Sequence, residues 1–171
     1  MGALLTPGRN GLTATAAPNT PIDFTLPASG GNLPGPSFVL SGFRSCPVVL
    51  YFYPKDSTPG CTTEAQDFRR LFPLFSKLGC VIAGISRDSL KSHDNFRCKQ
   101  ELPFALLSDA GETVCRQFGV IKMKKLYGKD VRGIERSTFL IGRDGRIARE
   151  WRGVKVAGHA EDVLAAVKDI P

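Results

Sequence analysis

The order of apolar and polar residues along the chain predicts alternating strands and helices. Two continuous apolar runs, PVVLYFY at residues 47–53 and CVIAGIS at residues 80–86, are typical of strands buried on both faces of a sheet. Between them, from Thr62 to Leu78, apolar residues recur at helical spacing, and Gly79 is a suitable helix end. Shorter runs predict three further strands, in the segments IDFTLP, SFVLSG and FALLSD.

The remaining segments add helices and a hairpin. The stretch RDSLKSHDNFRCKQEL is predicted as an amphipathic helix that ends before Pro103, and GETVCRQFG as a short helix. The runs IERSTFLI and RIAREW flank the turn GRDG, which indicates a β-hairpin with Asp144-Gly145 at its tip. The segment GHAEDVLAAVKDI predicts a last helix. This order predicts an α/β sandwich whose sheet is partly parallel and has an antiparallel edge.

Length and composition predict a simple domain organisation. The 171 residues suit one domain, which we place at residues 21–171. Residues 1–20 are small, polar and without periodicity, and we predict that they form a flexible arm. No apolar run approaches the roughly 20 residues that span a bilayer, and the first residues lack the pattern of a signal peptide. We therefore expect a cytoplasmic protein without membrane attachment.

The net charge of +7 raises the question of an acidic partner. Lysines and arginines are scattered along the chain, and their densest stretch is KMKKLYGKDVR at residues 122–132. We predict a solvated loop there, with a surface for an acidic partner as the alternative. No nucleic-acid-binding motif accompanies the charge, so nucleic acid is not expected as a partner.

The cysteines and histidines argue against a metal site and a disulfide scaffold. Five cysteines are an odd number, and none forms a C-x-x-C pair. His93 and His159 are the only histidines, and their separation does not match a metal-binding motif. We predict that both are surface or capping residues, and that the protein needs no metal and no organic cofactor.

One cysteine lies where a thiol becomes reactive. A predicted buried strand ends at Tyr53, and Pro54 turns the chain. Thr58 is a good helix N-cap, and Pro59 suits the first helical position. Cys61 then falls in the first turn, where free backbone N–H groups and the helix dipole favour the thiolate. A reactive thiol is favoured over a buried structural cysteine.

At these residues the chain resembles the peroxiredoxin family. Pro54, Thr58 and Cys61 match its P-x-x-x-T-x-x-C signature, and YFYPKDSTPGCTTEA is similar to the peroxiredoxin Q branch, also called bacterioferritin comigratory protein. The resemblance covers about residues 21–170 and includes the blocks GISRDSLKSHDNF, PFALLSD and YGKDVRGIERSTFLIGRDGRI. It implies a thioredoxin-like fold, in which helices flank a central mixed sheet, and a thiol peroxidase activity.

The resemblance also implies roles for individual residues. Cys61 would be the peroxidatic cysteine, Thr58 the hydroxyl that bonds the thiolate and the peroxide, and Pro54 the residue that shields the pocket. Arg136, in ERSTF, would supply a cation to the thiolate; without the resemblance, an ion pair with Glu135 or Asp144 would be favoured. The implied substrates are hydrogen peroxide and alkyl hydroperoxides, the implied reductant is thioredoxin or glutaredoxin, and we expect a monomer.

The chain departs from the family at the second, resolving cysteine. Many relatives carry it five residues after the first, where this chain has Gln66. Another group carries it in the helix after the next strand, and Cys98 is the candidate there. The helix register decides which way the Cys98 side chain points, because a shift of one residue turns a side chain by about 100° around the helix. Cys46, Cys80 and Cys115 are predicted to be structural.

Three alternatives remain open from the sequence. The same thiol could act in a redox sensor that relays oxidation to a partner. It could also belong to a one-cysteine peroxidase that an external thiol resolves. A Cys-His hydrolase built on Cys61 is a third possibility, although no motif places a histidine with an orienting carboxylate.

Overall fold

The fold is taken from a computed structural model, which describes residues 20–171. The flexible arm predicted for residues 1–20 lies outside the described residues, except for Thr20. None of the described helices is long and apolar enough to span a membrane.

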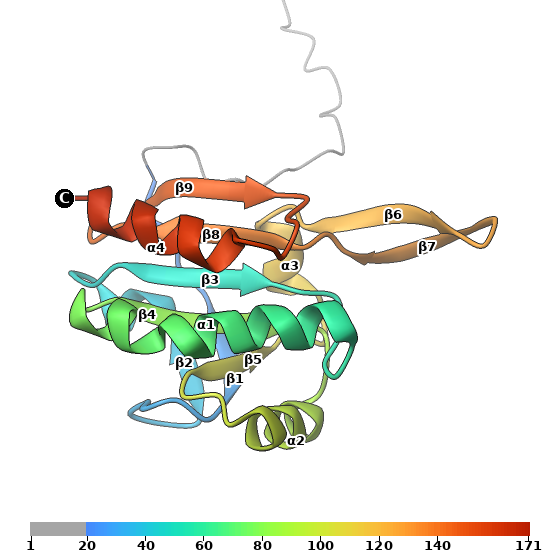
Figure 1. The fold of residues 1–171 in the computed structure, drawn as a ribbon, viewed down its shortest axis with the longest axis horizontal. Helices are drawn as coiled ribbons and strands as arrows, with labels where there is room; N and C mark the ends of the chain where they lie inside the picture. Colours follow the sequence, from blue (N-terminus) through green and yellow to red (C-terminus); the bar gives the residue numbers. More distant parts are fainter. Residues whose placement is uncertain (1–19) are drawn as a thin grey trace, which may run out of the picture.

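A seven-stranded mixed sheet forms the centre of the molecule, as the sequence predicts (Figure 1). Strands β3, β4 and β5 are parallel to one another, and β1, β2, β8 and β9 complete the sheet with antiparallel pairs. The spatial order is β2-β1-β5-β4-β3-β8-β9. The strand bounds are β1 Thr25–Ser29, β2 Ser37–Val39, β3 Val48–Phe52, β4 Val81–Ser86, β5 Ala105–Ser108, β8 Ser137–Ile141 and β9 Ile147–Arg152.

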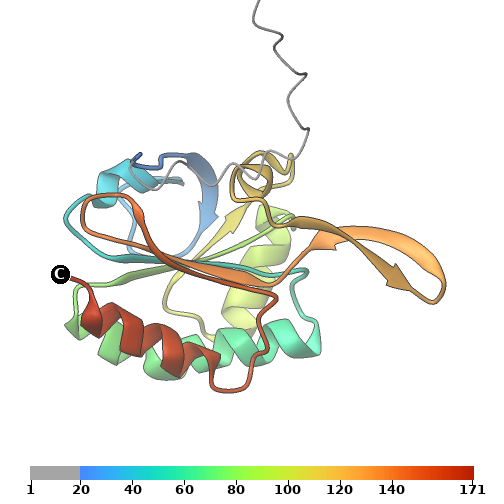
Figure 2. The same ribbon diagram turned by 90° about the horizontal axis from the view of Figure 1, so that it is seen from above.

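Helices cover both faces of this sheet (Figure 2). Helices α1 (Pro59–Lys77), α2 (Leu90–Gln100) and α4 (His159–Asp169) pack against one face. Helix α3 (Thr113–Gln117) and the 3-10 helix Leu40–Phe43 pack against the other. The predicted strand SFVLSG is only half right, because Leu40–Phe43 form a 3-10 helix.

Strand β3 shows why the sequence builds two core layers. Its side chains alternate in direction, so Val49 and Tyr51 contact the layer under α1, and Leu50 and Phe52 contact the opposite layer. All five of its residues are buried, as expected for a central strand. The adjacent β4 carries Gly84 where the Tyr51 ring passes, and a Cβ at that position would lie 2.7 Å from the ring.

The stretch predicted as a solvated loop is instead a β-hairpin, so that prediction was wrong. Strands β6 (Ile121–Leu126) and β7 (Lys129–Ile134) pair in register and project from the body of the molecule (Figure 1). Tyr127 and Gly128 form the tip, and both have a positive φ, as a type I′ turn requires. The pattern hid these strands because most of their side chains are exposed, so neither face shows an apolar alternation.

Candidate active site

The backbone geometry places Cys61 in the first turn of α1. Thr58 is extended and occupies the N-cap position, and Pro59 begins the helix, as predicted. The Thr58 hydroxyl does not cap the helix, however, because it donates to the carbonyl oxygen of Lys55 at 2.8 Å. The first N–H groups of α1 therefore receive no side-chain cap from Thr58, and such groups favour a negative charge near the buried Cys61 thiol.

Arg136 brings a positive charge to this thiol. Its Nη2 donates to the Sγ atom of Cys61 at 3.4 Å, and its Nη1 donates to Oε1 of Glu64 at 2.8 Å. Arg136 lies between β7 and β8, and the antiparallel pairing of β8 with β3 brings it to the end of the sheet where α1 begins. Arg136 therefore forms its ion pair with Glu64. Asp144, one of the partners expected without the family resemblance, pairs with Arg146 instead.

Glu64 is part of this site, although the sequence analysis did not single it out. It lies one helical turn after Cys61, on the same buried side of α1. Burial raises its pKa to about 7, although the charge of Arg136 opposes the shift. The sequence feature that could have pointed to Glu64 is its place three residues after the reactive cysteine, on a helix face that is otherwise apolar.

The raised pKa of Glu64 predicts a stability change with pH. An acid with a folded-state pKa above its unfolded value favours folding while it is protonated, so this contribution falls as pH rises from about 4.5 to about 7. Its size is about 1.4 kcal/mol for each unit of pKa difference. Glu64→Gln should remove this part of the pH dependence, as measured by urea unfolding across that range.

Glu112 offers a matched control for that experiment. Hydrogen bonds from Arg132 lower its pKa to about 2, so its contribution to stability is lost only as pH falls below about 4.5. Glu112→Gln should therefore leave the slope between pH 4.5 and 7 as in the wild type. An unchanged slope in Glu64→Gln would show that the carboxyl of Glu64 does not titrate in this window.

A buried polar network lies beneath the loop that precedes Cys61. Asp56, in that loop, accepts hydrogen bonds from the Tyr53 hydroxyl at 2.6 Å and the Ser92 hydroxyl at 2.8 Å. His93 Nδ1 lies 2.7 Å from Asp56 Oδ2, and its Nε2 lies 2.9 Å from the carbonyl oxygen of Leu107. Both ring nitrogens face an acceptor, and the network ties the loop to α2.

The prediction that both histidines are surface or capping residues was therefore wrong. His93 is completely buried, and His159 is 5% exposed. His159 Nε2 lies 2.8 Å from the Thr138 hydroxyl, and burial lowers the pKa of this histidine to about 4. No local pattern indicates this burial, because the hydrogen-bond partners of both rings come from distant segments.

The other predicted site residues lie around this centre. Pro54 lines a cleft together with Lys55, Arg87, Asp88 and Glu112. Cys98 is exposed on α2, and all five cysteines are free. Burial raises the pKa of Cys80 to about 12 and that of Cys115 above the usual range, in agreement with structural roles.

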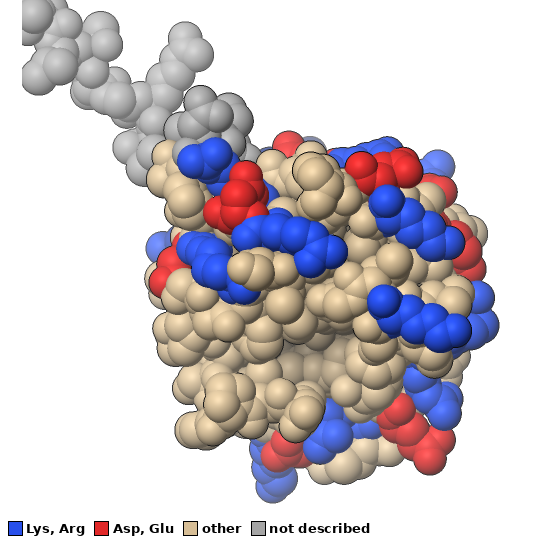
Figure 3. All heavy atoms as spheres, turned by 90° about the vertical axis from the view of Figure 1, so that its left-hand side faces the viewer, with Lys and Arg blue, Asp and Glu red and all other residues tan. Residues whose placement is uncertain are grey.

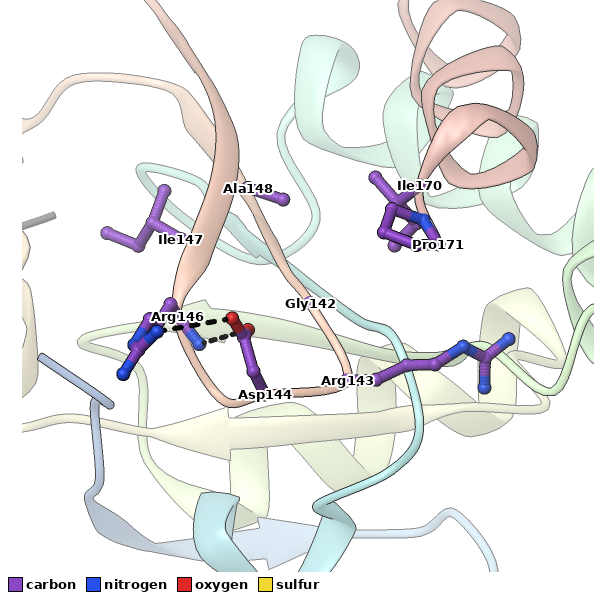
Figure 4. A pocket seen from close by; sticks show the side chains of 8 residues that line it. All are labelled: Gly142, Arg143, Asp144, Arg146, Ile147, Ala148, Ile170 and Pro171. Carbon is purple, nitrogen blue, oxygen red and sulfur yellow. Dashed lines mark hydrogen bonds and ion pairs between the residues drawn. The ribbon is translucent and has the colours of Figure 1, made fainter. Parts of the chain in front are cut away.

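A second hollow lies at the opposite end of the sheet. It opens at the turn between β8 and β9 and is lined by Arg143, Asp144, Arg146 and Pro171, among others (Figure 4). No cysteine lines it, and the Asp144 carboxylate accepts a hydrogen bond from the backbone N–H of Arg146 at 3.0 Å. Among residues 20–171, no group of three or more metal-ligating side chains is assembled.

The fold and the site together define a class. A thiol at the start of a helix, beside an arginine that directly precedes a strand of the mixed sheet, is the arrangement of a thiol-dependent enzyme with a thioredoxin-like fold. The AhpC/TSA family model matches residues 16–150, and the chain belongs to this family, the peroxiredoxins. It is thus an oxidoreductase of the peroxidase class, and the predicted family and fold are confirmed.

Relatives and solved structures support this assignment. Peroxiredoxin Bcp of Xanthomonas campestris is 54% identical over 88% of this chain and 92% of its own length. Peroxiredoxin Bcp of Bacillus subtilis is 49% identical over 80% of this chain and 87% of its own. A structure of Xanthomonas campestris peroxiredoxin Q is 54% identical, superimposes with a TM-score of 0.78, and covers 85% of this chain and 89% of that one.

Proposed function

We propose that this peroxiredoxin reduces hydrogen peroxide and alkyl hydroperoxides through Cys61, and that thioredoxin or glutaredoxin recycles it. The observation that carries the proposal is the Arg136 guanidinium, 3.4 Å from the Cys61 sulfur at the start of α1. The related Xanthomonas campestris bacterioferritin comigratory protein has been described in terms of its alkyl peroxide reduction activity.

The proposed reaction begins with the Cys61 thiolate. Its sulfur attacks one peroxide oxygen, so that an S–O bond forms as the O–O bond breaks. The leaving oxygen takes up a proton and departs as water or an alcohol, and Cys61 becomes a sulfenic acid. Arg136 and the first N–H groups of α1 would stabilise the negative charge on the leaving oxygen.

Thr58 and Pro54 have supporting roles in this proposal. Because the Thr58 hydroxyl donates its proton to the Lys55 carbonyl, its oxygen remains available as an acceptor for the O–H group of a hydroperoxide. Pro54 follows the buried Tyr53 directly and has no backbone N–H, so it would shield the thiolate without adding a competing donor.

Cys98 is the proposed resolving residue. Its thiolate would attack the sulfenic sulfur of Cys61 and release water, and a dithiol reductant would then exchange with the disulfide. Two exposed contacts, Gln66 with Gln100 and Arg69 with Glu101, join α1 to the end of α2. We expect these contacts to break when the disulfide forms.

Unwinding of α2 should be confined to its last turn. His93 and Phe96 anchor the earlier turns in the core, whereas Cys98 and Lys99 are exposed. Exposed helix ends open at low cost. The spacing differs from that of one relative: in two Xanthomonas campestris structures with single cysteine-to-serine substitutions, the substituted positions lie one residue closer together than Cys61 and Cys98.

Peroxide consumption with thioredoxin, thioredoxin reductase and NADPH tests the proposal. We expect many turnovers per protein, and a loss of at least about tenfold in Cys98→Ser, with sulfenic or sulfinic acid accumulating at Cys61. Cys46→Ser, a change at a half-buried thiol before β3, should behave as the wild type. Normal cycling of Cys98→Ser would indicate a one-cysteine route or another partner thiol, and a single turnover in the wild type would favour a redox sensor.

The cytoplasm is the proposed location. All five cysteines are free, and Cys98 is exposed. Free exposed thiols persist in a reducing compartment, which also contains the thioredoxin and glutaredoxin systems.

A further inference from the structure

The projecting hairpin is a surface that the peroxidase reaction does not use. Strands β6 and β7 extend past the end of the sheet where β3 ends and α1 begins, which is the end that holds Cys61 (Figures 1 and 2). The hairpin carries five of the basic residues of the chain and one acidic residue, Asp130. On the opposite end of the molecule, acidic side chains accompany most of the basic ones (Figure 3).

The two faces of the hairpin differ in charge compensation. One face, here called the lysine face, consists of Lys122, Lys124, Leu126, Lys129 and Val131, which the strand register places together. Within the described chain, none of its three lysines forms an ion pair. On the other face Lys125 lies opposite Asp130, and Arg132 pairs with Glu112.

Exposed apolar side chains accompany these free charges. Leu126 is 54% exposed and Val131 42% exposed on the lysine face, and Tyr127 at the tip is 95% exposed. Exposed aromatic and aliphatic side chains that lie together indicate a surface that binds a partner, and unpaired cations beside them attract an acidic one. Hydroperoxides are too small to require such a surface.

The base of the hairpin is joined to the loop before Cys61. Glu112 binds Arg132 of β7 and also accepts a hydrogen bond from Arg87 at 3.1 Å. Arg87 and Glu112 line the same cleft as Pro54 and Lys55. A macromolecule held on the hairpin is therefore held beside the loop that precedes Cys61.

We propose that the lysine face docks the protein reductant, and that the reductant presents an acidic surface with apolar groups beside its dithiol. This inference rests on the proposed function, because only recycling brings a protein thiol to this end of the molecule. The positive charge of the lysine face favours an acidic protein, because three uncompensated lysines attract it and accelerate its association. The aliphatic side chains between them favour a protein contact over a purely ionic one.

Steady-state kinetics with two reductants tests the proposal. The variant Lys122→Glu/Lys124→Glu/Lys129→Glu is compared with wild type, using an acidic thioredoxin and, separately, dithiothreitol, which needs no docking surface. We expect the KM for thioredoxin to rise by about tenfold or more at low salt, and the difference to shrink at high salt. Turnover with dithiothreitol should stay unchanged.

A control variant separates local from global charge effects. Lys77→Glu/Arg143→Glu/Lys168→Glu makes the same change of charge at exposed basic residues away from the hairpin, and it should keep the wild-type KM. An unchanged thioredoxin KM in the hairpin variant would overturn the docking proposal. If the hairpin variant kept the wild-type KM but lost binding to anionic lipid vesicles, to a DNA duplex or to other copies of the chain, the lysine face would serve that partner. This result would also overturn the docking of the reductant. Absence of dithiothreitol-supported turnover in the wild type would instead overturn the proposed function.

Discussion

Replacing Cys61 with serine is expected to reduce hydroperoxide turnover to the background rate. The hydroxyl of serine is a far weaker nucleophile than a thiolate, and Arg136 cannot ionise it near neutral pH. Loss of a nucleophile typically costs several orders of magnitude in kcat. The fold should persist, because oxygen is smaller than sulfur and can still accept the bond from Arg136. Peroxide consumption with dithiothreitol and the far-UV circular dichroism spectrum measure the two effects.

Cys46→Ser is the matched control for this substitution. It removes a half-buried thiol before β3 that touches no part of the site described above. Turnover in Cys46→Ser should equal that of the wild type. If Cys61→Ser kept appreciable activity with a native spectrum, another thiol would have to be the nucleophile.

Arg136→Ala should slow the reaction of Cys61 with hydrogen peroxide by roughly 10²–10³-fold, the usual cost of removing a donor that stabilises an oxyanion. The guanidinium both favours the thiolate and faces the leaving oxygen in the proposed reaction. Stopped-flow mixing of the reduced protein with peroxide gives the second-order rate constant. Alkylation by iodoacetamide reports the thiolate separately, because that reagent has no O–O bond to break.

Arg136→Lys distinguishes charge from geometry. Lysine keeps the cation but cannot bond Cys61 and Glu64 with one planar fork, so an intermediate rate is expected. Arg136→Lys should also destabilise the protein less than Arg136→Ala, because the alanine leaves the buried Glu64 carboxyl without an ion-pair partner. Wild-type peroxide rates in a folded Arg136→Ala protein would place Arg136 outside the chemistry.

The sequence predicts the core elements well because their periodicity is set by burial. Strand β3 and helix α1 were predicted within a few residues, since β3 is buried on both faces and α1 on one. The hairpin of β6 and β7 was missed for the same reason: its strands are held by backbone pairing and carry few buried side chains. A pattern of burial cannot reveal strands that bury little.

The residues of the candidate site also fall into those that local sequence reveals and those that it does not. Thr58 and Cys61 are close in sequence, so local helix chemistry points to them, whereas Arg136 was selected through the family resemblance. His93 was misjudged because its partners, Asp56 and Leu107, come from two other segments. Glu64 was overlooked because its importance depends on burial next to Arg136. Contacts between distant segments define both residues, and no local pattern reports them.

Trapping the oxidised sulfur identifies the reactive cysteine directly. Reduced Cys98→Ser protein, which cannot form the proposed disulfide, is treated with one equivalent of hydrogen peroxide in the presence of dimedone, a reagent for sulfenic acids. Peptide mass spectrometry should find the adduct on the peptide that contains Cys61, with Cys46, Cys80 and Cys115 unmodified. Consumption of the peroxide with an adduct on another cysteine, or with none on Cys61, would contradict the assignment of Cys61 as the peroxidatic residue.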